Sequence, residues 1–218
     1  MPFLLDDRKA VFPDPLMADS NGLLAVGGSI TPEFLLEAYK LGIFPWFDPD
    51  MHPPLWWFPD PRPVFFPGEV KISKSMRQWL RRHKDYKITM DLAFDQVLRH
   101  CAEQPGRQQP GRWLTETLQA SLKELFRNGF ARSVEVWNGR GELVGGLYGV
   151  TPGNGIFSGE SMFHTEPNTS KAALIYLVQN AKNLGFHLID GQAESEHLIR
   201  MGAKLIPARE YYKILARH

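Results

Sequence analysis

A run of strand patterns in the second half of the chain constrains its fold most strongly. Apolar–polar alternation and turn signals predict three consecutive antiparallel strands, over residues 132–138, 142–150 and 156–163. The Asn138-Gly139 pair between the first two is a strong β-hairpin signal. An apolar helix over residues 172–184 and a buried-type strand over residues 186–189 follow. A strand, a helix and a strand after an antiparallel meander predict a mixed sheet with helices packed on it, which is an α+β fold.

Polar residues next to these strands indicate a site. Asp190 and Gln192 come directly after the last strand, and side chains two residues apart on a strand point to the same face. We therefore expect both to project into one cleft. In the third strand, Glu160 shares a face with the apolar residues Ile156 and Met162. A carboxylate in an apolar core is costly, so this position favours a cleft, and Glu160 is the third candidate site residue.

The composition of the 218-residue chain excludes several classes of protein. A single cysteine, Cys101, rules out an internal disulfide framework and zinc sites built on cysteine pairs, and it fits a reducing cytosol. No run of 18 apolar residues occurs, and residues 1–10 are mixed and charged. We therefore predict neither a membrane span nor a signal peptide, and a cytoplasmic location. The formal net charge of +1 means that any binding of nucleic acid must come from local clustering of basic residues.

Residues 43–67 combine prolines with large aromatic rings. Eight prolines interrupt any regular element here, so we expect the rings to be held in place without a helix or a sheet. The rings are those of Phe44, Trp46, Phe47, Trp56, Trp57, Phe58, Phe65 and Phe66. Large aromatic side chains bury well, which favours packing between domains, whereas a ring that stays accessible can stack on a base. We predict packing for most of these rings and a ligand platform for one tryptophan.

The one notable basic cluster lies between residues 71 and 87, where seven Lys or Arg residues face a single acid, Asp85. Ser73 can cap a helix running to about His83. Helical spacing places four basic residues in one stripe, namely Lys74, Arg77, Arg81 and Lys84. Such a stripe is usually a solvated surface. In a nearly neutral protein it can also contact a phosphate backbone, and both interpretations stay open at this point.

Several familiar catalytic motifs are absent from the sequence. There is no P-loop, no Gly-x-Gly-x-x-Gly before a helix, no helical pair of metal-ligating histidines and no serine in a nucleophile elbow. We predict neither a metal nor a cofactor. His197 could be catalytic, but a helix-packing role is favoured because nothing in the sequence pairs it with a nucleophile. What remains is an acid–amide pair, a nearby glutamate, apolar neighbours, and glycines at 145–149 that would let a ligand approach the backbone.

Such a site suits transfer of an already activated acyl group to an amine. An α-amino group has a pKa of about 7.7–8.0, so a usable fraction is neutral near pH 7. Holding amine and ester together can supply about 7–11 kcal/mol, which is more than general-base help usually gives. No protein nucleophile is then needed.

Motifs spread in order over nearly the whole chain resemble one family. They are Phe44-Pro45-Trp46-Phe47, Trp56-Trp57-x-Pro59-Asp60-Pro61-Arg62, Gly145-Gly146-Leu147-Tyr148-Gly149-Val150, Gly159-Glu160-Ser161-Met162-Phe163, Ser170-Lys171 and Asp190-x-Gln192. Together they are similar to the leucyl/phenylalanyl-tRNA–protein transferases. The resemblance implies a bacterial enzyme that moves leucine or phenylalanine, with methionine as a further donor, from aminoacyl-tRNA to the α-amine of proteins beginning with Arg or Lys. The product carries an N-degron and is sent to proteolysis.

The resemblance also implies a domain organisation. A small N-terminal α/β domain, which we place at residues 1–62, precedes a larger mixed-sheet domain at residues 63–218 that is similar to the GNAT acyltransferase fold. No metal, nucleotide cofactor or membrane partner is implied, and we expect a monomer.

Roles for particular residues follow from the same resemblance. Gln192 takes up or orients the proton of the amine, Asp190 polarises or holds Gln192, and Glu160 is an acid beside them. Apart from the resemblance, we infer that the charge of Glu160 can attract the acceptor's Arg or Lys. Trp46 and Trp113 correspond to residues that hold the terminal adenosine. The pocket for the donor side chain corresponds to Leu147, Phe157, Met162, Leu174, Leu177 and Ile189. The basic stripe corresponds to a region suited to gripping the tRNA, with Lys74, Arg77, Arg81 and Lys84.

Two other functions compete with this prediction. An acetyl-CoA-dependent N-acetyltransferase of GNAT fold would need a glycine-rich pyrophosphate loop entering a helix, and residues 168–171 contain no glycine. A non-catalytic RNA-binding module would explain the basic stripe and the tryptophans, but not an acid–amide pair beside apolar residues. Transfer from aminoacyl-tRNA is therefore favoured.

Overall fold

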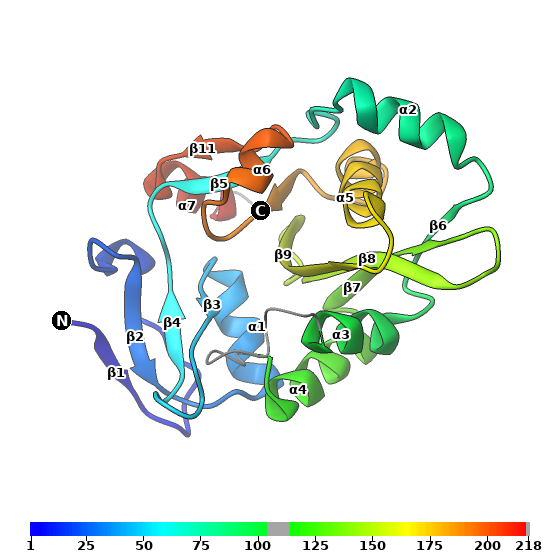
Figure 1. Cartoon of the computed structure of the whole chain (residues 1–218). Helices are drawn as coiled ribbons and strands as arrows, with labels where there is room; N and C mark the ends of the chain where they lie inside the picture. The colour runs from blue at the N-terminus through cyan, green and yellow to red at the C-terminus, as the bar shows by residue number, and fades with distance from the viewer. Residues whose placement is uncertain (104–113, 217–218) are drawn as a thin grey trace.

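Two β-sheets organise the chain in the computed structural model, which describes residues 1–103 and 114–216 (Figure 1). The smaller sheet has the strand order β1-β2-β4-β3 and the larger one the order β11-β5-β10-β9-β8-β7-β6. Trp113, one of the two predicted adenosine contacts, lies outside the described residues. Both the α+β class and the mixed character of the larger sheet are confirmed.

The smaller sheet is built from the first 57 residues. Its strands are β1 (Phe3–Leu5), β2 (Leu23–Gly27), β3 (Phe44–Pro45) and β4 (Leu55–Trp57), and a short 3-10 helix, η1, covers Pro15–Met17. Between β2 and β3 lies α1 (Pro32–Lys40). The Thr31 hydroxyl accepts a hydrogen bond from the Phe34 backbone N–H at 3.3 Å, which satisfies a free amide at the start of α1. The buried face of α1 then faces the larger sheet, because Leu35 and Tyr39 pack in one core with Tyr148.

The larger sheet carries the site. Its strands are β5 (Arg62–Phe65), β6 (Lys87–Met90), β7 (Ala131–Trp137), β8 (Leu143–Val150), β9 (Ile156–His164), β10 (Leu188–Asp190) and β11 (Lys204–Ile206). Strand β10 pairs with β9 in parallel and with β5 in an antiparallel arrangement. The three predicted meander strands form with nearly the expected bounds, and the strand that follows the apolar helix lies beside the third of them.

Helices cover both faces of this sheet. Helix α5 (Thr169–Asn180) packs on one face of β7 and β8, and α3 (Phe94–Glu103) with α4 (Glu116–Arg127) packs on the other (Figure 1). The remaining helices are α2 (Lys74–Arg82), α6 (Glu196–Arg200) and α7 (Ala208–Leu215). Helix α5 ends at Asn180, four residues before the predicted end, and the residues that follow form a turn. None of the helices in the described part of the chain combines the length and apolar composition that crossing a bilayer requires.

The proline-rich segment does form sheet, so the expectation that it would lie outside regular structure was wrong. Strand β5 lies between β11 and β10 although Pro63 is in it. A proline cannot donate to a sheet, but its carbonyl can accept, and Pro63 O accepts from the Gly191 backbone N–H at 2.8 Å. Pro45 lies on β3, which is an edge strand, where a missing donor is tolerated.

The burial of the eight rings confirms that most of them pack. The rings of Phe44, Trp56, Phe58 and Phe65 are buried, and those of Phe47, Trp57 and Phe66 are half-buried. Trp46 alone of the eight is exposed, at 57%. One tryptophan is therefore accessible to a planar ligand while most of the segment packs.

The glycines of β8 serve packing rather than ligand approach, which corrects the interpretation made from the sequence. A Cβ atom at Gly145 would collide with the Thr169 side chain, and one at Gly149 would collide with the Phe157 ring. Thr169 begins α5 and Phe157 lies on β9, so the missing side chains let a helix and a strand approach β8 closely.

Candidate active site

A β-bulge places Glu160. Tyr148 on β8 lies opposite Ser161 and Gly149 lies opposite Gly159, so Glu160 is an extra residue without a partner across the ladder. Because one residue is inserted, side chains beyond the bulge change faces. The expectation that Ile156 and Met162 share a face with Glu160 was therefore wrong. Ile156 packs in the core on the α1 side of the sheet, whereas Met162 packs with the α5 side.

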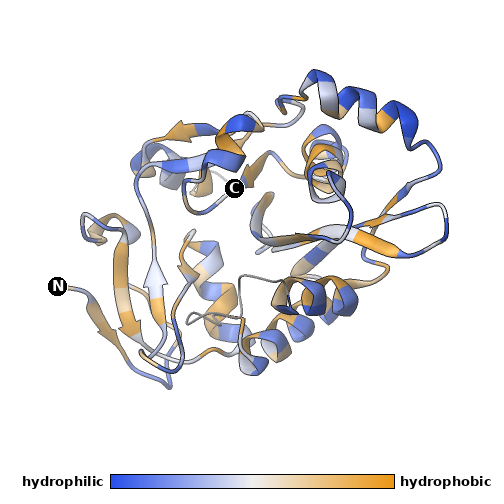
Figure 2. Ribbon diagram, viewed as in Figure 1, coloured by the Kyte–Doolittle hydropathy of each residue, from blue (hydrophilic) through white to orange (hydrophobic). Residues whose placement is uncertain are grey.

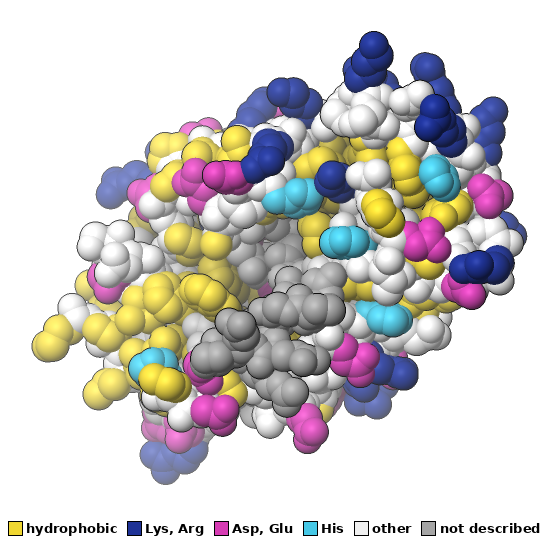
Figure 3. Space-filling model, viewed as in Figure 1, with side chains coloured by type: hydrophobic (Ala, Val, Ile, Leu, Met, Phe, Trp, Pro, Cys, Tyr) yellow, Lys and Arg dark blue, Asp and Glu magenta, His cyan; other side chains and the backbone are white. Residues whose placement is uncertain are grey.

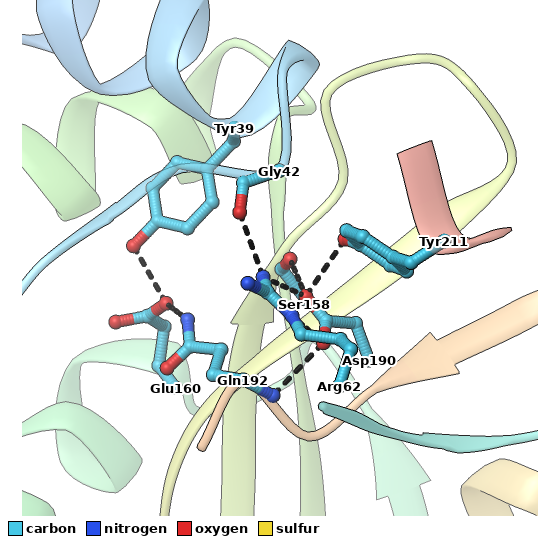
Figure 4. A network of polar contacts seen from close by, with 8 residues as sticks. All are labelled: Tyr39, Gly42, Arg62, Ser158, Glu160, Asp190, Gln192 and Tyr211. Atoms are coloured by element: carbon cyan, nitrogen blue, oxygen red, sulfur yellow. Dashed lines mark hydrogen bonds and ion pairs between the residues drawn. The ribbon is translucent and has the colours of Figure 1, made fainter. Parts of the chain in front are cut away.

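Glu160 is half-buried and accepts two hydrogen bonds on one oxygen (Figure 4). The Tyr39 hydroxyl donates to Oε1 at 2.6 Å, and the Gln192 side-chain Nε2 donates to the same atom. Burial raises the pKa of the Glu160 carboxyl from 4.5 to about 7, although both hydrogen bonds act to lower it. Glu160 is thus a carboxyl whose charge changes near neutral pH.

Gln192 lies beyond the end of its strand, which changes the geometry expected of the acid–amide pair. Strand β10 ends at Asp190, and Gln192 has a left-handed backbone with φ 62°. Its backbone N–H donates to Asp190 Oδ1 at 2.8 Å, so the two residues form a tight turn rather than sharing a strand face. The side chain of Gln192 reaches Glu160, while Asp190 stays behind it.

The Asp190 carboxylate is completely buried and fully engaged (Figure 4). Arg62 donates from Nε to Oδ1 and from Nη2 to Oδ2, both at 2.7 Å. Oδ2 also accepts from the Tyr211 hydroxyl at 2.9 Å and from the Ser158 hydroxyl at 3.0 Å. A buried carboxylate is tolerated because these donors replace water and the guanidinium supplies the opposite charge.

An apolar cavity of about 220 Å³ adjoins this network. Five of the six residues predicted for the donor pocket line it, namely Leu147, Phe157, Met162, Leu174 and Ile189. The sixth, Leu177, is not among the lining residues and is fully buried, because it lies one helical turn beyond Leu174 where α5 packs on the sheet. Phe65 and Leu198 add to the apolar lining of this cavity, and Glu160 adds a carboxyl group to it.

A second cavity, of about 310 Å³, lies on the other side of Glu160. Trp46 and Trp57 line it, together with Gln192 and Glu160. The Trp57 Nε1–H donates to the Trp46 backbone oxygen at 2.6 Å, and the two rings lie 6.0 Å apart between centroids. The exposed Trp46 ring is therefore braced next to the site. Since Glu160 lines both cavities, they meet at the Glu160–Gln192 contact.

The sequence assigned no role to three residues that hold this arrangement, although one of them, Arg62, ends the motif at residues 56–62. They are Tyr39, Arg62 and Tyr211, each at most 1% exposed. The one local signal was an arginine flanked by prolines at 61 and 63, which is an unusual setting for a charged residue. His197, interpreted as a packing residue, lines the apolar cavity, and burial together with nearby cationic side chains lowers the pKa of its imidazole.

Three residues of the predicted basic stripe, Lys74, Arg77 and Arg81, lie on α2, whereas Lys84 lies in a turn beyond the end of the helix, so its placement on the helix was wrong. Ser73 caps α2 by accepting from the Met76 backbone N–H at 3.1 Å. All four stripe residues are exposed, and none forms an ion pair with another residue in the described ranges. Figure 2 shows α2 to be largely hydrophilic, and Figure 3 shows Lys and Arg side chains gathered over it. Within the described residues, no group of His, Cys, Asp or Glu is arranged to hold a metal ion.

Family models and curated relatives match this chain over most of its length. A model described as leucyl/phenylalanyl-tRNA protein transferase matches residues 64–216, and a model of the N-terminal domain of the same family matches residues 28–60.

The chain belongs to the leucyl/phenylalanyl-tRNA–protein transferase family.

Relatives of the same description support this membership of the leucyl/phenylalanyl-tRNA–protein transferase family. One from Shewanella sp. strain MR-4 is 49% identical over 215 residues, covering 98% of this chain and 89% of the relative. One from Shewanella baltica strain OS155 is 48% identical over 97% of this chain and 88% of its own length. One from Shewanella oneidensis is 47% identical over 98% and 89%. As a leucyl/phenylalanyl-tRNA–protein transferase family member, the chain is an aminoacyltransferase whose substrates are aminoacyl-tRNA and protein.

Solved structures show only distant likeness to this leucyl/phenylalanyl-tRNA–protein transferase family member. L-PGS from Bacillus licheniformis covers 90% of this chain and 71% of its own at 13% identity, with a TM-score of 0.49. A GCN5-related N-acetyltransferase from Kribbella flavida covers 78% and 59% at 12% identity, with a TM-score of 0.42.

The raised pKa of Glu160 predicts a pH dependence of stability for this transferase family member. The folded state holds a proton on Glu160 that the unfolded state has lost between about pH 4.5 and 7, so stability falls as pH rises through this window. Replacing Glu160 with Gln removes the effect. Between pH 5 and 7.5, the free energy of unfolding of E160Q minus that of the wild type should increase by at most about 3 kcal/mol. Urea unfolding measures this difference. Parallel pH dependences in the two proteins would contradict the assignment.

Proposed function

We propose that this chain transfers Leu or Phe, with Met as a further donor, from the 3′ end of aminoacyl-tRNA to the α-amine of proteins that begin with Arg or Lys. The observation that supports this most is the meeting of two unlike cavities at the Glu160–Gln192 contact. An aminoacyl-adenosine is an apolar side chain joined by an ester to a nucleoside. With the side chain in the apolar cavity and the adenine on Trp46, the ester carbonyl would lie at the junction.

The orientation of the Gln192 amide suits it to handle an amine. Its Nε2 donates to Glu160, so its carbonyl oxygen is the end left to accept a hydrogen bond from an amine N–H. The neutral amine attacks the ester carbonyl, the new C–N bond forms, and the C–O bond to the ribose breaks. One amine proton leaves to the ribose oxygen. Gln192 orients the amine through this step, and positioning supplies most of the rate.

Recognition of an Arg or Lys at the acceptor's N-terminus falls to Glu160 in this proposal. Two carboxylates border the apolar cavity, and that of Asp190 is already paired with Arg62. Glu160 has no cationic partner in the described residues. A pKa near 7 means that an approaching guanidinium or ammonium group would favour the charged carboxylate and hold it in place.

The biological setting follows from these substrates. Aminoacyl-tRNA is a cytoplasmic substrate, so we place the reaction in the cytoplasm, where the transferred residue creates an N-degron that directs the product to proteolysis. The proposal needs no metal or nucleotide cofactor, and a monomer contains both cavities.

A transfer assay tests the proposal directly. Purified protein should transfer labelled leucine from Leu-tRNA to a peptide with N-terminal Arg, without ATP or added metal. A peptide of the same sequence with N-terminal Glu is the matched control and should accept little. Acetylation of the Arg peptide from acetyl-CoA, with no transfer from Leu-tRNA, would instead support the N-acetyltransferase alternative. Binding of tRNA without transfer to any acceptor would support the RNA-binding alternative.

The basic stripe on α2 is expected to bind the phosphate backbone of the tRNA. Charge reversal at Arg77 and Arg81 should weaken tRNA binding and lower the slope of log affinity against log salt by about one unit per residue. Reversal at Arg99 and Arg127 makes the same change in net charge on α3 and α4, where both residues are exposed, and should have little effect. Filter binding at several salt concentrations measures both. Equal losses of tRNA affinity in the two double variants would show that the basic stripe is an ordinary solvated surface.

A further inference from the structure

Gln192 has a left-handed backbone conformation, which residues other than glycine rarely adopt. It is one of three non-glycine residues with positive φ among the described residues, and it follows the end of β10 directly. A non-glycine residue in the left-handed region needs local contacts to stay there. The turn it forms has two anchors, which are the Gly191 N–H donating to Pro63 O and the Gln192 N–H donating to Asp190 Oδ1, both at 2.8 Å.

Asp190 acts on Gln192 through the backbone. Among the described contacts, its carboxylate touches the Gln192 backbone N–H and not the side-chain amide, which reaches Glu160 instead (Figure 4). The same Oδ1 that accepts from Gln192 also accepts from Arg62 Nε. The position of Oδ1, and with it the turn, therefore depends on how the carboxylate is held.

Arg62 fixes the plane of that carboxylate from a rigid setting. Its two parallel hydrogen bonds engage both carboxylate oxygens, and its Nη2 also donates to the Gly42 backbone oxygen at 2.7 Å. The guanidinium carbon lies 4.5 Å from the centroid of the Tyr211 ring and 5.1 Å from that of Phe44. The side chain is fully buried, so no water competes for these contacts. Gly42 follows α1, and α1 carries Tyr39. The backbone of Gln192 is linked to Gly42 through Asp190 and Arg62, and its side chain is linked to Tyr39 through Glu160.

We propose that Arg62, assisted by Tyr211, is a positioning residue that sets the left-handed turn of Gln192 through the Asp190 carboxylate and thereby aims the Gln192 carbonyl oxygen at the acceptor amine. This inference rests on the proposed role of Gln192 in aminoacyl transfer. It assigns Asp190 the task of holding the Gln192 backbone rather than exchanging a proton with its amide. The charge of Arg62 alone is not sufficient, because only the planar guanidinium can engage both oxygens at once.

The variant Arg62→Lys tests this, because it keeps the positive charge and removes the two parallel hydrogen bonds of the guanidinium to Asp190. We expect kcat for transfer from Leu-tRNA to an Arg peptide to fall at least tenfold while KM for Leu-tRNA changes less than threefold. Amide exchange at Gln192, followed by mass spectrometry of peptides covering residues 188–193, should become faster. Tyr211→Phe, which removes one hydrogen bond to Oδ2 and no charge, should show the same pattern with a smaller fall in kcat.

The matched control is Arg132→Lys, which makes the same change in a half-buried ion pair with Asp91 outside the site. It should leave kcat and exchange at Gln192 as in the wild type. Wild-type kcat and exchange in both R62K and Y211F would overturn the inference, as would a loss seen only in KM for Leu-tRNA. If R62K does not fold, Y211F decides alone. Absence of transfer by the wild type would count against the proposed function and not against the positioning of Gln192, which the exchange measurement reports separately.

Discussion

Replacing Gln192 with Ala should lower kcat for transfer by about 100-fold, because a loss of positioning of this kind at a reacting group costs about that much. Binding of aminoacyl-tRNA should change little, since the Gln192 side chain contributes one polar contact at the junction while the two cavities stay intact. Single-turnover transfer with saturating Leu-tRNA measures the first effect and filter binding measures the second.

The exposed Gln96 on α3 offers a matched control for this prediction. Gln96→Ala removes the same side chain from the surface and should leave both measurements unchanged. A Q192A variant that loses tRNA binding while keeping its single-turnover rate would show that Gln192 holds the donor rather than the amine. That outcome would overturn the role proposed for it.

Replacing Trp46 with Ala should weaken binding of the donor about 5- to 150-fold, as stacking of one base on an aromatic ring contributes about 1–3 kcal/mol. The ring is 57% exposed at the mouth of a 310 Å³ cavity, so its loss removes ligand contact with little cost to the core. The KM for Leu-tRNA, or the inhibition constant of an aminoacyl-adenosine analogue, measures the change. Trp46→Phe keeps a ring and should recover most of the affinity.

Trp56→Phe provides a contrast within the same segment. Trp56 is fully buried and its Nε1–H donates to Gly27 O at 2.8 Å, so W56F should lower the unfolding temperature and leave KM near the wild-type value. Equal KM values for W46A and the wild type would place the adenosine elsewhere. Because Trp46 and Trp56 have the same side chain, the comparison distinguishes a ring that binds a ligand from a ring that packs in the core.

The sequence predicted individual elements well where local chemistry decides them. Ser73 caps α2 in the predicted place, because an N-cap depends on residues within one turn. The strand patterns of β7, β8 and β9 also appear with nearly the predicted bounds, since alternation records which face is buried. The motifs were specific enough to indicate the family from residues alone, and the family models confirm it.

Predictions failed where a single residue interrupts the side-chain alternation of a strand. They also failed where a residue contacts another that is distant in the sequence. The bulge at Glu160 inverts side-chain faces on β9, and a regular alternation cannot reveal an inserted residue. Gln192 was expected to point with Asp190 because both were read as strand residues, yet the strand ends between them. The prolines around β5 suggested irregular structure, but a strand needs only its carbonyls where its neighbour supplies the donor.

The sequence by itself determined the α+β class, the cap of α2, the basic cluster, the exposed tryptophan among packed rings and the identity of the residues Glu160, Asp190 and Gln192. Only the tertiary structure decided how those three residues relate. The contacts that set them join Tyr39 to Glu160 across 121 positions and Arg62 to Asp190 across 128. Local periodicity carries no information about such pairs. Tyr39 reaches Glu160 only when α1 packs against the larger sheet, and Arg62 reaches Asp190 only when β5 pairs with β10 inside that sheet.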